Sequence, residues 1–254
     1  MKLRRFVVGA VIACVGTTPV LGQTGPFLEV SGDFSPVRTG GAYVNWQMAH
    51  VAAGVQQEGR FGWMALADRH QRGNVFDVSF GANGFRRIGA WTVFGSAAFV
   101  DSPHFLYERS FEGEVSRTLV GTLVAQLGYR HLEFPESRVG ILQPGVSLYF
   151  SRGMLEARTF LVRNVTANTD NVTVLARGTF DATSRVRLMT GFARGARIFD
   201  VSSLSNPNAD AWVAFGSARF EVVPQWSVEV GIGGAHEDPF FSQRTVALRL
   251  RRSF

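Results

Sequence analysis

The chain has 254 residues, of which 46% are hydrophobic and only 18% are charged, and its formal net charge is +6. That length is enough for one large domain or two small ones, and no proline- or serine-rich linker divides it. The basic residues are scattered and form no basic run, so the positive charge does not predict nucleic acid as a partner.

The N-terminus predicts a secretory signal peptide over residues 1–22. The first five residues include three basic side chains, residues 6–15 are apolar, and the segment ends on the small residue Gly22. The apolar stretch is too short to span a bilayer, so we predict cleavage between Gly22 and Gln23. The signal holds three basic and no acidic residues, so its removal lowers the formal charge from +6 to +3.

An alternative interpretation of the N-terminus is lipoprotein processing at Cys14, the only cysteine in the chain. Residues 11–14 loosely resemble such a site. Processing there would leave an unusually short apolar core and an apolar mature start. Cleavage after Gly22 instead gives a mature chain over residues 23–254 that contains no cysteine and forms no disulfide.

Beyond the signal, apolar residues alternate with polar or small ones, as in strands whose two faces meet different surroundings. No apolar run approaches the ~20 residues that a membrane helix requires. In the segment at 44–48, for example, Val44, Trp46 and Met48 form the apolar face, and several tryptophans are candidates for aromatic girdles at membrane interfaces. The alternating segments are 28–34, 44–48, 61–67, 76–82, 91–99, 107–115, 123–129, 142–150, 155–161, 172–180, 186–192, 212–222, 226–232 and 244–254.

These segments predict an all-β fold, an antiparallel transmembrane β-barrel of about 14 strands, with 12 possible if weak strands merge. Strands in lipid must pair on both edges, so such a sheet has to close. The connections alternate in length, as expected if both termini face the periplasm. The longer connections are predicted at 35–42, 101–105, 134–138, 163–171, 199–211 and 235–242, and the shorter ones at 86–89, 151–153, 182–184 and 223–225.

The last strand has an apolar face of Val246, Leu248 and Leu250, and the chain stops on Phe254 in phase with that face. This ending resembles the C-terminal strand that the barrel-assembly machinery reads in bacterial outer membranes. We therefore expect Phe254 to act as an assembly signal. Arg252 departs from that pattern, and we expect its long stem to snorkel to the membrane edge.

The chain resembles the YaiO-type family of outer-membrane β-barrel proteins over most of its mature length. The resemblance implies the outer membrane of a Gram-negative bacterium and no known substrate, and fold alone does not settle function. The motifs that carry it are Leu127-Gly128-Tyr129-Arg130-His131-Leu132, Glu133-Phe134-Pro135, Pro144-Gly145-Val146-Ser147-Leu148-Tyr149-Phe150, Leu155-Glu156-Ala157-Arg158, Leu161-Val162-Arg163 and the single Asp68.

Charged residues of both signs fall on the predicted interior faces. One interpretation is an internal salt-bridge network, because unpaired buried charge is costly. The other is a polar pore whose charged rings tune selectivity. The residues predicted to form this lumen charge network are Glu108, Glu112, Glu114, Arg130, Glu156, Arg158, Arg177 and Arg219.

Catalytic and metal motifs are weak. None of the five histidines lies two residues before a serine, the spacing associated with outer-membrane lipid A deacylases. His236, Glu237 and Asp238 contain metal-binding groups, but exposed loop residues bind metals only occasionally. We therefore predict no catalytic residues, no cofactor and no metal site.

The sequence thus predicts a monomeric protein of the cell outer membrane, with a narrow channel for small solutes or saccharides. Its expected partners are outer-membrane lipid, lipopolysaccharide and the barrel-assembly machinery. Two alternatives stay open, namely a barrel-embedded lipid-modifying hydrolase and a surface-binding or structural barrel that transports nothing.

Overall fold

The computed structural model describes residues 24–57, 59–195, 210–237 and 241–254, so the predicted signal peptide lies outside the described residues. The described residues contain no helix that is long and apolar enough to cross a membrane. The strands are β1 (Gly25–Thr39), β2 (Ala42–Gln57), β3 (Phe61–Arg72), β4 (Val75–Ile88), β5 (Trp91–Val100), β6 (Arg109–Val120), β7 (Leu123–Glu133), β8 (Arg138–Phe150), β9 (Gly153–Asn164), β10 (Thr169–Thr183), β11 (Val186–Gly195), β12 (Ala211–Val223), β13 (Trp226–Glu237) and β14 (Phe241–Ser253).

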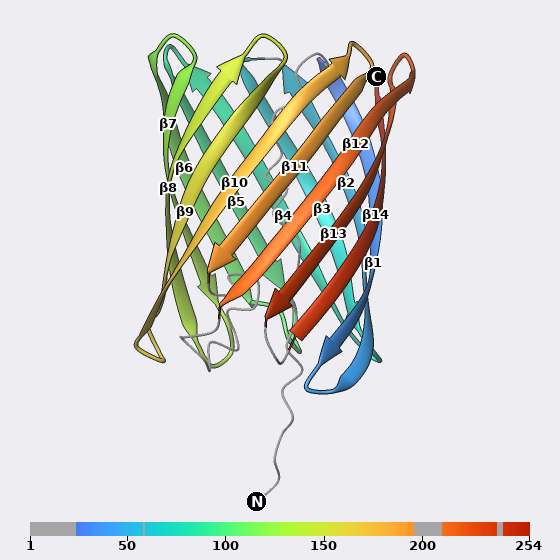
Figure 1. Ribbon diagram of the computed structural model, residues 1–254, viewed down its shortest axis with the longest axis vertical. Helices are drawn as coiled ribbons and strands as arrows, with labels where there is room; N and C mark the ends of the chain where they lie inside the picture. Colours follow the sequence, from blue (N-terminus) through green and yellow to red (C-terminus); the bar gives the residue numbers. More distant parts are fainter. Residues whose placement is uncertain (1–23, 58, 196–209, 238–240) are drawn as a thin grey trace, which may run out of the picture.

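The fourteen strands form one closed antiparallel barrel, which confirms the predicted fold and the larger of the two strand numbers. Each strand pairs with its neighbours in sequence, and β1 closes the barrel against β14, with Val30 opposite Leu250. Figure 1 shows the strands tilted steeply around the barrel. Closure leaves no free sheet edge, as a sheet surrounded by lipid requires.

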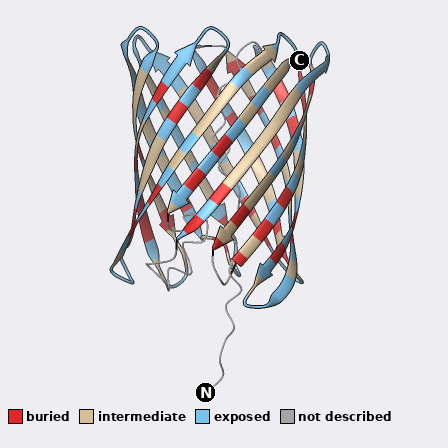
Figure 2. Ribbon diagram, in the orientation of Figure 1, coloured by how far each residue is buried: buried red, intermediate tan, exposed pale blue. Residues whose placement is uncertain are grey.

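The two faces of the wall differ as the alternation predicts. Along β1, Leu28, Val30 and Phe34 are exposed on the outside, whereas Glu29 and Ser35 are buried inside. Figure 2 shows the same alternation of buried and exposed positions along most strands. A polar face that is buried inside an apolar wall is the reverse of a soluble domain, and it suits lipid outside.

The barrel has two unlike ends. At the end that we call the turn end, where Gly25 and Phe254 lie, every connection is a tight turn. The opposite end, which we call the loop end, holds all the connections that are longer than three residues. The turn-end connections are residues 58–60, 89–90, 121–122, 151–152, 184–185 and 224–225, and the loop-end ones are 40–41, 73–74, 101–108, 134–137, 165–168, 196–210 and 238–240.

The predicted loop at 35–42 is wrong. β1 and β2 continue until only Gly40 and Gly41 separate them. Their φ angles are 55° and 87°, a left-handed backbone that permits a two-residue hairpin turn matching the twist of the strands. Ser35, Pro36 and Val37, which were expected in the loop, pair with β2 instead.

The expected outward face of β2 is also wrong at its loop end. Trp46 is only 5% exposed, so it does not belong to an interfacial girdle. It points into the barrel and packs there against Phe241, with the ring centroids 5.8 Å apart. We call this interior group the loop-end cluster, and its buried members are Val37, Trp46, Ala193, Val213, Ala235 and Phe241.

Candidate functional site in the barrel lumen

A network of side chains crosses the inner wall from β6 to β10, and Arg158 lies at its centre. Its Nη1 donates to Glu114 Oε2 at 2.7 Å and to Gln143 Oε1 at 3.2 Å, and its Nη2 donates to Gln126 Oε1 at 2.5 Å. Its Nε lies 3.2 Å from Glu156 Oε1. The members of this central network are Glu112, Glu114, Gln126, Gln143, Glu156, Arg158 and Arg177.

Two glycines lie beside this network on β7 and β8. A Cβ at Gly145 would meet the Cβ and Cγ of Arg158 at 3.5 Å, and a Cβ at Gly128 would meet Glu114 Oε2 at the same distance. With no side chain on β7 and β8 at these points, Arg158 on β9 reaches Glu114 on β6. The small residues thus make room for polar side chains to bond along the wall.

The structure brings together five of the eight residues predicted for the lumen charge network. Glu114, Glu156, Arg158 and Arg177 are linked by ion pairs, and Glu112 joins through the amide of Gln143. The other three residues make no ion pair with this group among the residues that the structure describes, although Arg130 lies opposite Glu112 in the pairing of β6 with β7. Glu108 is exposed in the loop before β6, Arg130 donates to Ser110 Oγ at 3.3 Å, and Arg219 lies in a second cluster.

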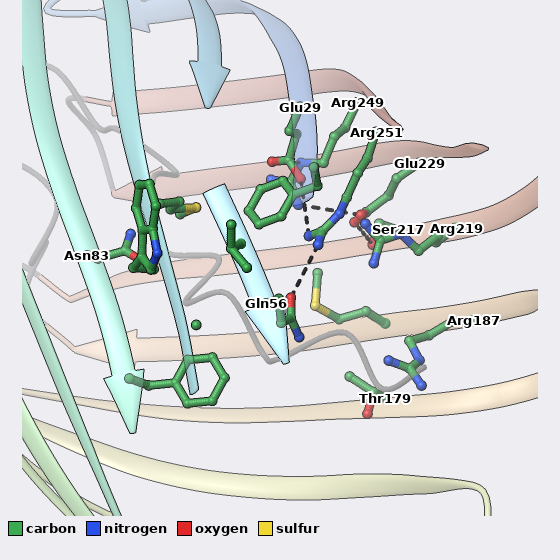
Figure 3. Close-up of a pocket in the computed structure, with 17 residues that line it drawn as sticks. Glu29, Gln56, Asn83, Thr179, Arg187, Ser217, Arg219, Glu229, Arg249 and Arg251 are labelled. Atoms are coloured by element: carbon green, nitrogen blue, oxygen red, sulfur yellow. Dashed lines mark hydrogen bonds and ion pairs between the residues drawn. The ribbon is translucent and has the colours of Figure 1, made fainter. Parts of the chain in front are cut away.

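That second cluster lines a cavity that is open to solvent, which we call the turn-end cavity; its empty space together with the adjoining solvent is about 840 Å³. Figure 3 shows its charged residues gathered on one wall, with Asn83 on the opposite side. Arg249 lies between two carboxylates, 3.3 Å from Glu29 and 3.5 Å from Glu229. The charged residues of the cavity are Glu29, Arg187, Arg219, Glu229, Arg249 and Arg251.

The connection at 101–108 packs against buried residues at the loop end. Asp77, only 3% exposed, accepts the backbone N–H groups of His104, Phe105 and Leu106 at 2.9, 3.0 and 2.9 Å. The His104 ring nitrogen Nδ1 also lies 2.9 Å from Asp77. One carboxylate thus anchors four polar groups of the loop.

Apolar contacts hold the same loop on both sides. The guanidinium of Arg72 lies 4.0 Å from the ring centroid of Phe105, and Leu106 is buried. Tyr107 packs against an interior apolar group on β7 to β9 that contains Leu132 and Val139. The loop therefore contacts strands on both sides of the loop-end mouth.

A histidine lies between two carboxylates on the inner wall. His50 Nδ1 is 2.5 Å from Asp68 Oδ1, and its Nε2 is 3.8 Å from Glu29 Oε1. Ser79 Oγ donates to the other oxygen of Asp68 at 3.4 Å. Both Ser79 and His50 therefore bond to Asp68, and this arrangement lacks the contact between a hydroxyl nucleophile and a base that covalent catalysis needs.

The structure brings no metal ligands together within the described ranges, where no group of three or more acidic, histidine or cysteine side chains is spaced to hold an ion. His236 packs against Trp212 on the outer wall, with the ring centroids 6.0 Å apart and the rings tilted by 48°, whereas Glu237 is buried. Asp238, the third residue considered for a metal, lies outside the described residues.

Phe254 and Arg252 lie on the outer wall at the turn end. The backbone N–H of Phe254 donates to Pro26 O at 2.9 Å, which extends the pairing of β14 with β1. The Arg252 guanidinium lies 4.6 Å from the Phe254 ring and 5.4 Å from the Trp226 ring.

The assembly role of Phe254 stays a prediction. Its removal should lower the heat-modifiable barrel form on gels far more than removal of another exposed phenylalanine.

A closed barrel with an apolar outer wall and a polar lumen defines an outer-membrane β-barrel protein. The family model described as the YaiO membrane beta barrel domain matches residues 28–196, which is more than half of the chain. The chain therefore belongs to the YaiO family, as its motifs predicted, and the protein is located in the bacterial outer membrane.

Solved structures share the architecture at low sequence identity. A bacterial polysaccharide outer membrane secretin matches at a TM-score of 0.56 with 8% identity, covering 91% of this chain and 99% of that one. The NalP autotransporter translocator domain from Neisseria meningitidis gives 0.51 with 12% identity and coverages of 92% and 90%. An anion-selective porin from Comamonas acidovorans gives 0.50 with 10% identity and coverages of 90% and 98%. No curated protein matches the sequence.

The different lengths of the connections at the two ends predict how the barrel is oriented in the membrane. In outer-membrane barrels, the short turns face the periplasm and the longer loops face the outside. By this rule we expect the turn end and its charged cavity to face the periplasm and the loop end to face the cell surface.

Proposed function

We propose that the protein is a narrow channel for small polar solutes or saccharides, obstructed at the loop end. The observation that carries the proposal is the lining of the lumen. Charged and amide side chains form the turn-end cavity and the central network, whereas the loop at 101–108 and the apolar groups narrow the outer mouth. A purely structural barrel has no need of an open charged cavity beneath an anchored loop.

The central network makes the path narrow. The side chain of Arg158 is only 12% exposed because its neighbours surround it. The network contains three glutamates and two arginines, so it carries one excess negative charge. Water and small solutes have to pass a wall of side chains that are held by mutual hydrogen bonds, which favours small conductance.

Planar-bilayer recordings test the channel. We expect small steps from the native protein and larger ones from a variant in which two glycines replace residues 102–107. Large, stable steps from the native protein would reject the obstruction and favour a general porin. Silence from both proteins, with the barrel intact by heat-modifiable migration, would favour a structural or surface-binding role.

The proposal treats the lumen as non-catalytic. It is supported by the geometry at Asp68, where Ser79 and His50 each bond to the carboxylate rather than to one another. Purified protein incubated with phospholipid or lipid A should release no acyl chain. Release that disappears in a His50→Ala variant would instead establish the hydrolase alternative.

We also propose a monomer, because the barrel closes on itself and leaves no sheet edge for a second copy. Light scattering of the purified protein, corrected for bound detergent, should give the mass of one chain. A larger mass would indicate association through the outer wall.

A further inference from the structure

The turn-end cavity contains more positive than negative side chains. Four arginines and two glutamates line it, namely Arg187, Arg219, Arg249, Arg251, Glu29 and Glu229. Arg187 is neutralised by Asp181, with Nε–Oδ1 at 2.6 Å and Nη2–Oδ2 at 3.1 Å. Three guanidinium groups therefore share two carboxylates.

This sharing is uneven. Arg249 contacts both glutamates, and Arg251 lies 3.9 Å from Glu29. Glu229 also accepts a hydrogen bond from Ser217 Oγ at 2.7 Å. Arg219 makes no ion pair within 4.0 Å with any residue that the structure describes, although it lies beside Glu229 in Figure 3.

Two hydrogen-bond donors in the cavity wall lack acceptors. The Nε atoms of Arg219 and Arg251 are buried and donate no hydrogen bond in the described part of the chain, whereas Arg249 Nε lies 3.3 Å from Glu29 Oε1. An unsatisfied buried donor is destabilising, and more so when the group is charged. The two donors lie on β12 and β14, on either side of β13, and both arginines line the same cavity.

We infer that the turn-end cavity is a binding site for an oxyanion, the carboxylate or phosphate group of a small solute. Such a group balances the excess of guanidinium groups over carboxylates in the cavity wall, and guanidinium groups bind both kinds of oxyanion in charge-assisted pairs. The site rests on the proposed channel only for the route by which the solute enters or leaves.

The rest of the cavity wall suits the uncharged part of a sugar. Gln56, Asn83 and Thr179 present amide and hydroxyl groups, and Phe27 presents a ring. The Arg251 guanidinium lies 3.8 Å from the centroid of the Phe27 ring and holds it against the charged wall. A saccharide that carries one acidic group would therefore find both hydroxyl partners and an apolar surface.

Isothermal titration calorimetry of the purified barrel in detergent tests the site. The probes are glucuronate, glucose 1-phosphate, inorganic phosphate and glucose, each at low ionic strength. We expect the charged probes to bind and glucose to give no heat above dilution. Binding of both phosphate probes but not glucuronate would assign a phosphate group, and binding of glucuronate alone would assign a carboxylate.

Three variants test which residues form the binding site. Arg219→Gln should weaken binding at least tenfold, because it removes the guanidinium that has no carboxylate partner. Glu229→Gln should strengthen binding several-fold, because it removes a competing negative charge. Arg86→Gln is the control, since Arg86 is exposed on the outer wall at the same end of the barrel and undergoes the same change of charge.

Absence of binding by all charged probes would overturn the site, and so would equal binding by the Arg219→Gln and Arg86→Gln proteins, each with an intact barrel by heat-modifiable migration. Failure of the channel proposal is distinguishable from this. A protein that is silent in bilayers but binds glucuronate through Arg219 would keep the site and lose the transport role.

Discussion

On β1 and β14, the inner face changes from charged to apolar side chains between the two ends of the lumen. Along the inner face of β1, the chain passes from Glu29 near the turn end to the fully buried Val37 near the loop end. β14 changes in the same sense, from Arg251 to Phe241. The outer wall stays largely apolar throughout, so membrane insertion does not require this change.

This difference between the inner faces indicates that the two ends of the lumen have different functions. Apolar side chains at the loop end pack against each other and exclude water, which suits a closure. Guanidinium and carboxylate groups at the turn end stay beside an open cavity, where water or a solute reaches them. A barrel that only filled its interior would be expected to use one chemistry along its whole length.

The sharpest test of the packed end is Trp46→Ala. Loss of a buried indole that packs on Phe241 should lower the free energy of unfolding by about 3–5 kcal/mol. The measurement is denaturant unfolding of the barrel in lipid vesicles. Trp91→Ala is the matched control, since Trp91 is 45% exposed on the outer wall. Equal losses in the two variants would show that the loop end is not a packed core.

A second variant, at Asp77, is designed to release the loop at 101–108 while leaving the loop-end cluster unchanged. Asp77→Asn keeps the size of the side chain but gives the loop at 101–108 a weaker acceptor and an unwanted N–H donor. Hydrogen bonds to a charged acceptor contribute about 1.5–3 kcal/mol each, and Asp77 accepts three from backbone groups. We expect single-channel conductance to rise several-fold in planar bilayers.

The control for this variant is Asp101→Asn, which changes an exposed carboxylate of the same loop that Asp77 anchors. It should leave the conductance unchanged. If Asp77→Asn also conducts like the native protein while its barrel remains intact, then the anchored loop is not the obstruction.

Sequence alone was sufficient for the barrel because a strand's period of two is a local signal. Alternation such as that of Leu28, Val30 and Phe34 depends only on what lies on each side of one strand. It failed at Trp46, because an apolar residue on an inner face is indistinguishable from one on an outer face until the interior is known to contain an apolar cluster. The prediction of a loop at 35–42 failed because the length of a strand depends on how far it pairs with its neighbour, and β1 pairs with β2 as far as Thr39.

The grouping of the lumen charges was less predictable. Arg158 meets Glu114 across three strand pairings, and the contact depends on their registers and on the glycines at 128 and 145. Arg219 falls in another cluster because β12 lies on a different part of the wall. The role of Asp77 had no local signal, since its partners are 27 to 29 residues away.

Arg158→Ser tests the middle of the lumen, between the two ends. The change removes a side chain that bonds Glu114, Gln126 and Gln143, so we expect moderately larger conductance steps. Release of the carboxylates should also shift the reversal potential in a salt gradient toward cations. Arg130→Ser is the matched control, because Arg130 lies opposite Glu112 but donates to Ser110 and makes no ion pair with the network among the described residues. Equal effects of the two variants would indicate a response to lumen charge alone.

The smallest effect is expected outside the lumen, at the exposed ion pair of Arg194 and Asp210 near the loop end. Arg194 Nη2 lies 2.6 Å from Asp210 Oδ2, and hydrogen bonding from Arg194 holds the pKa of Asp210 below its usual range. A carboxyl whose pKa is lowered by folding stabilises the protein above its unfolded pKa of about 3.9, and the contribution is lost as pH falls through the lower folded value.

Asp210→Asn should leave conductance and stability at pH 7 almost unchanged, because exposed pairs contribute little. Below about pH 4, the melting temperature of the native barrel should fall slightly more steeply than that of the variant, until the two curves run parallel. A large loss of stability or a changed conductance at pH 7 would instead mean that this outer pair supports the obstructed mouth, and the contrast between the two ends of the lumen would then extend to the outer wall.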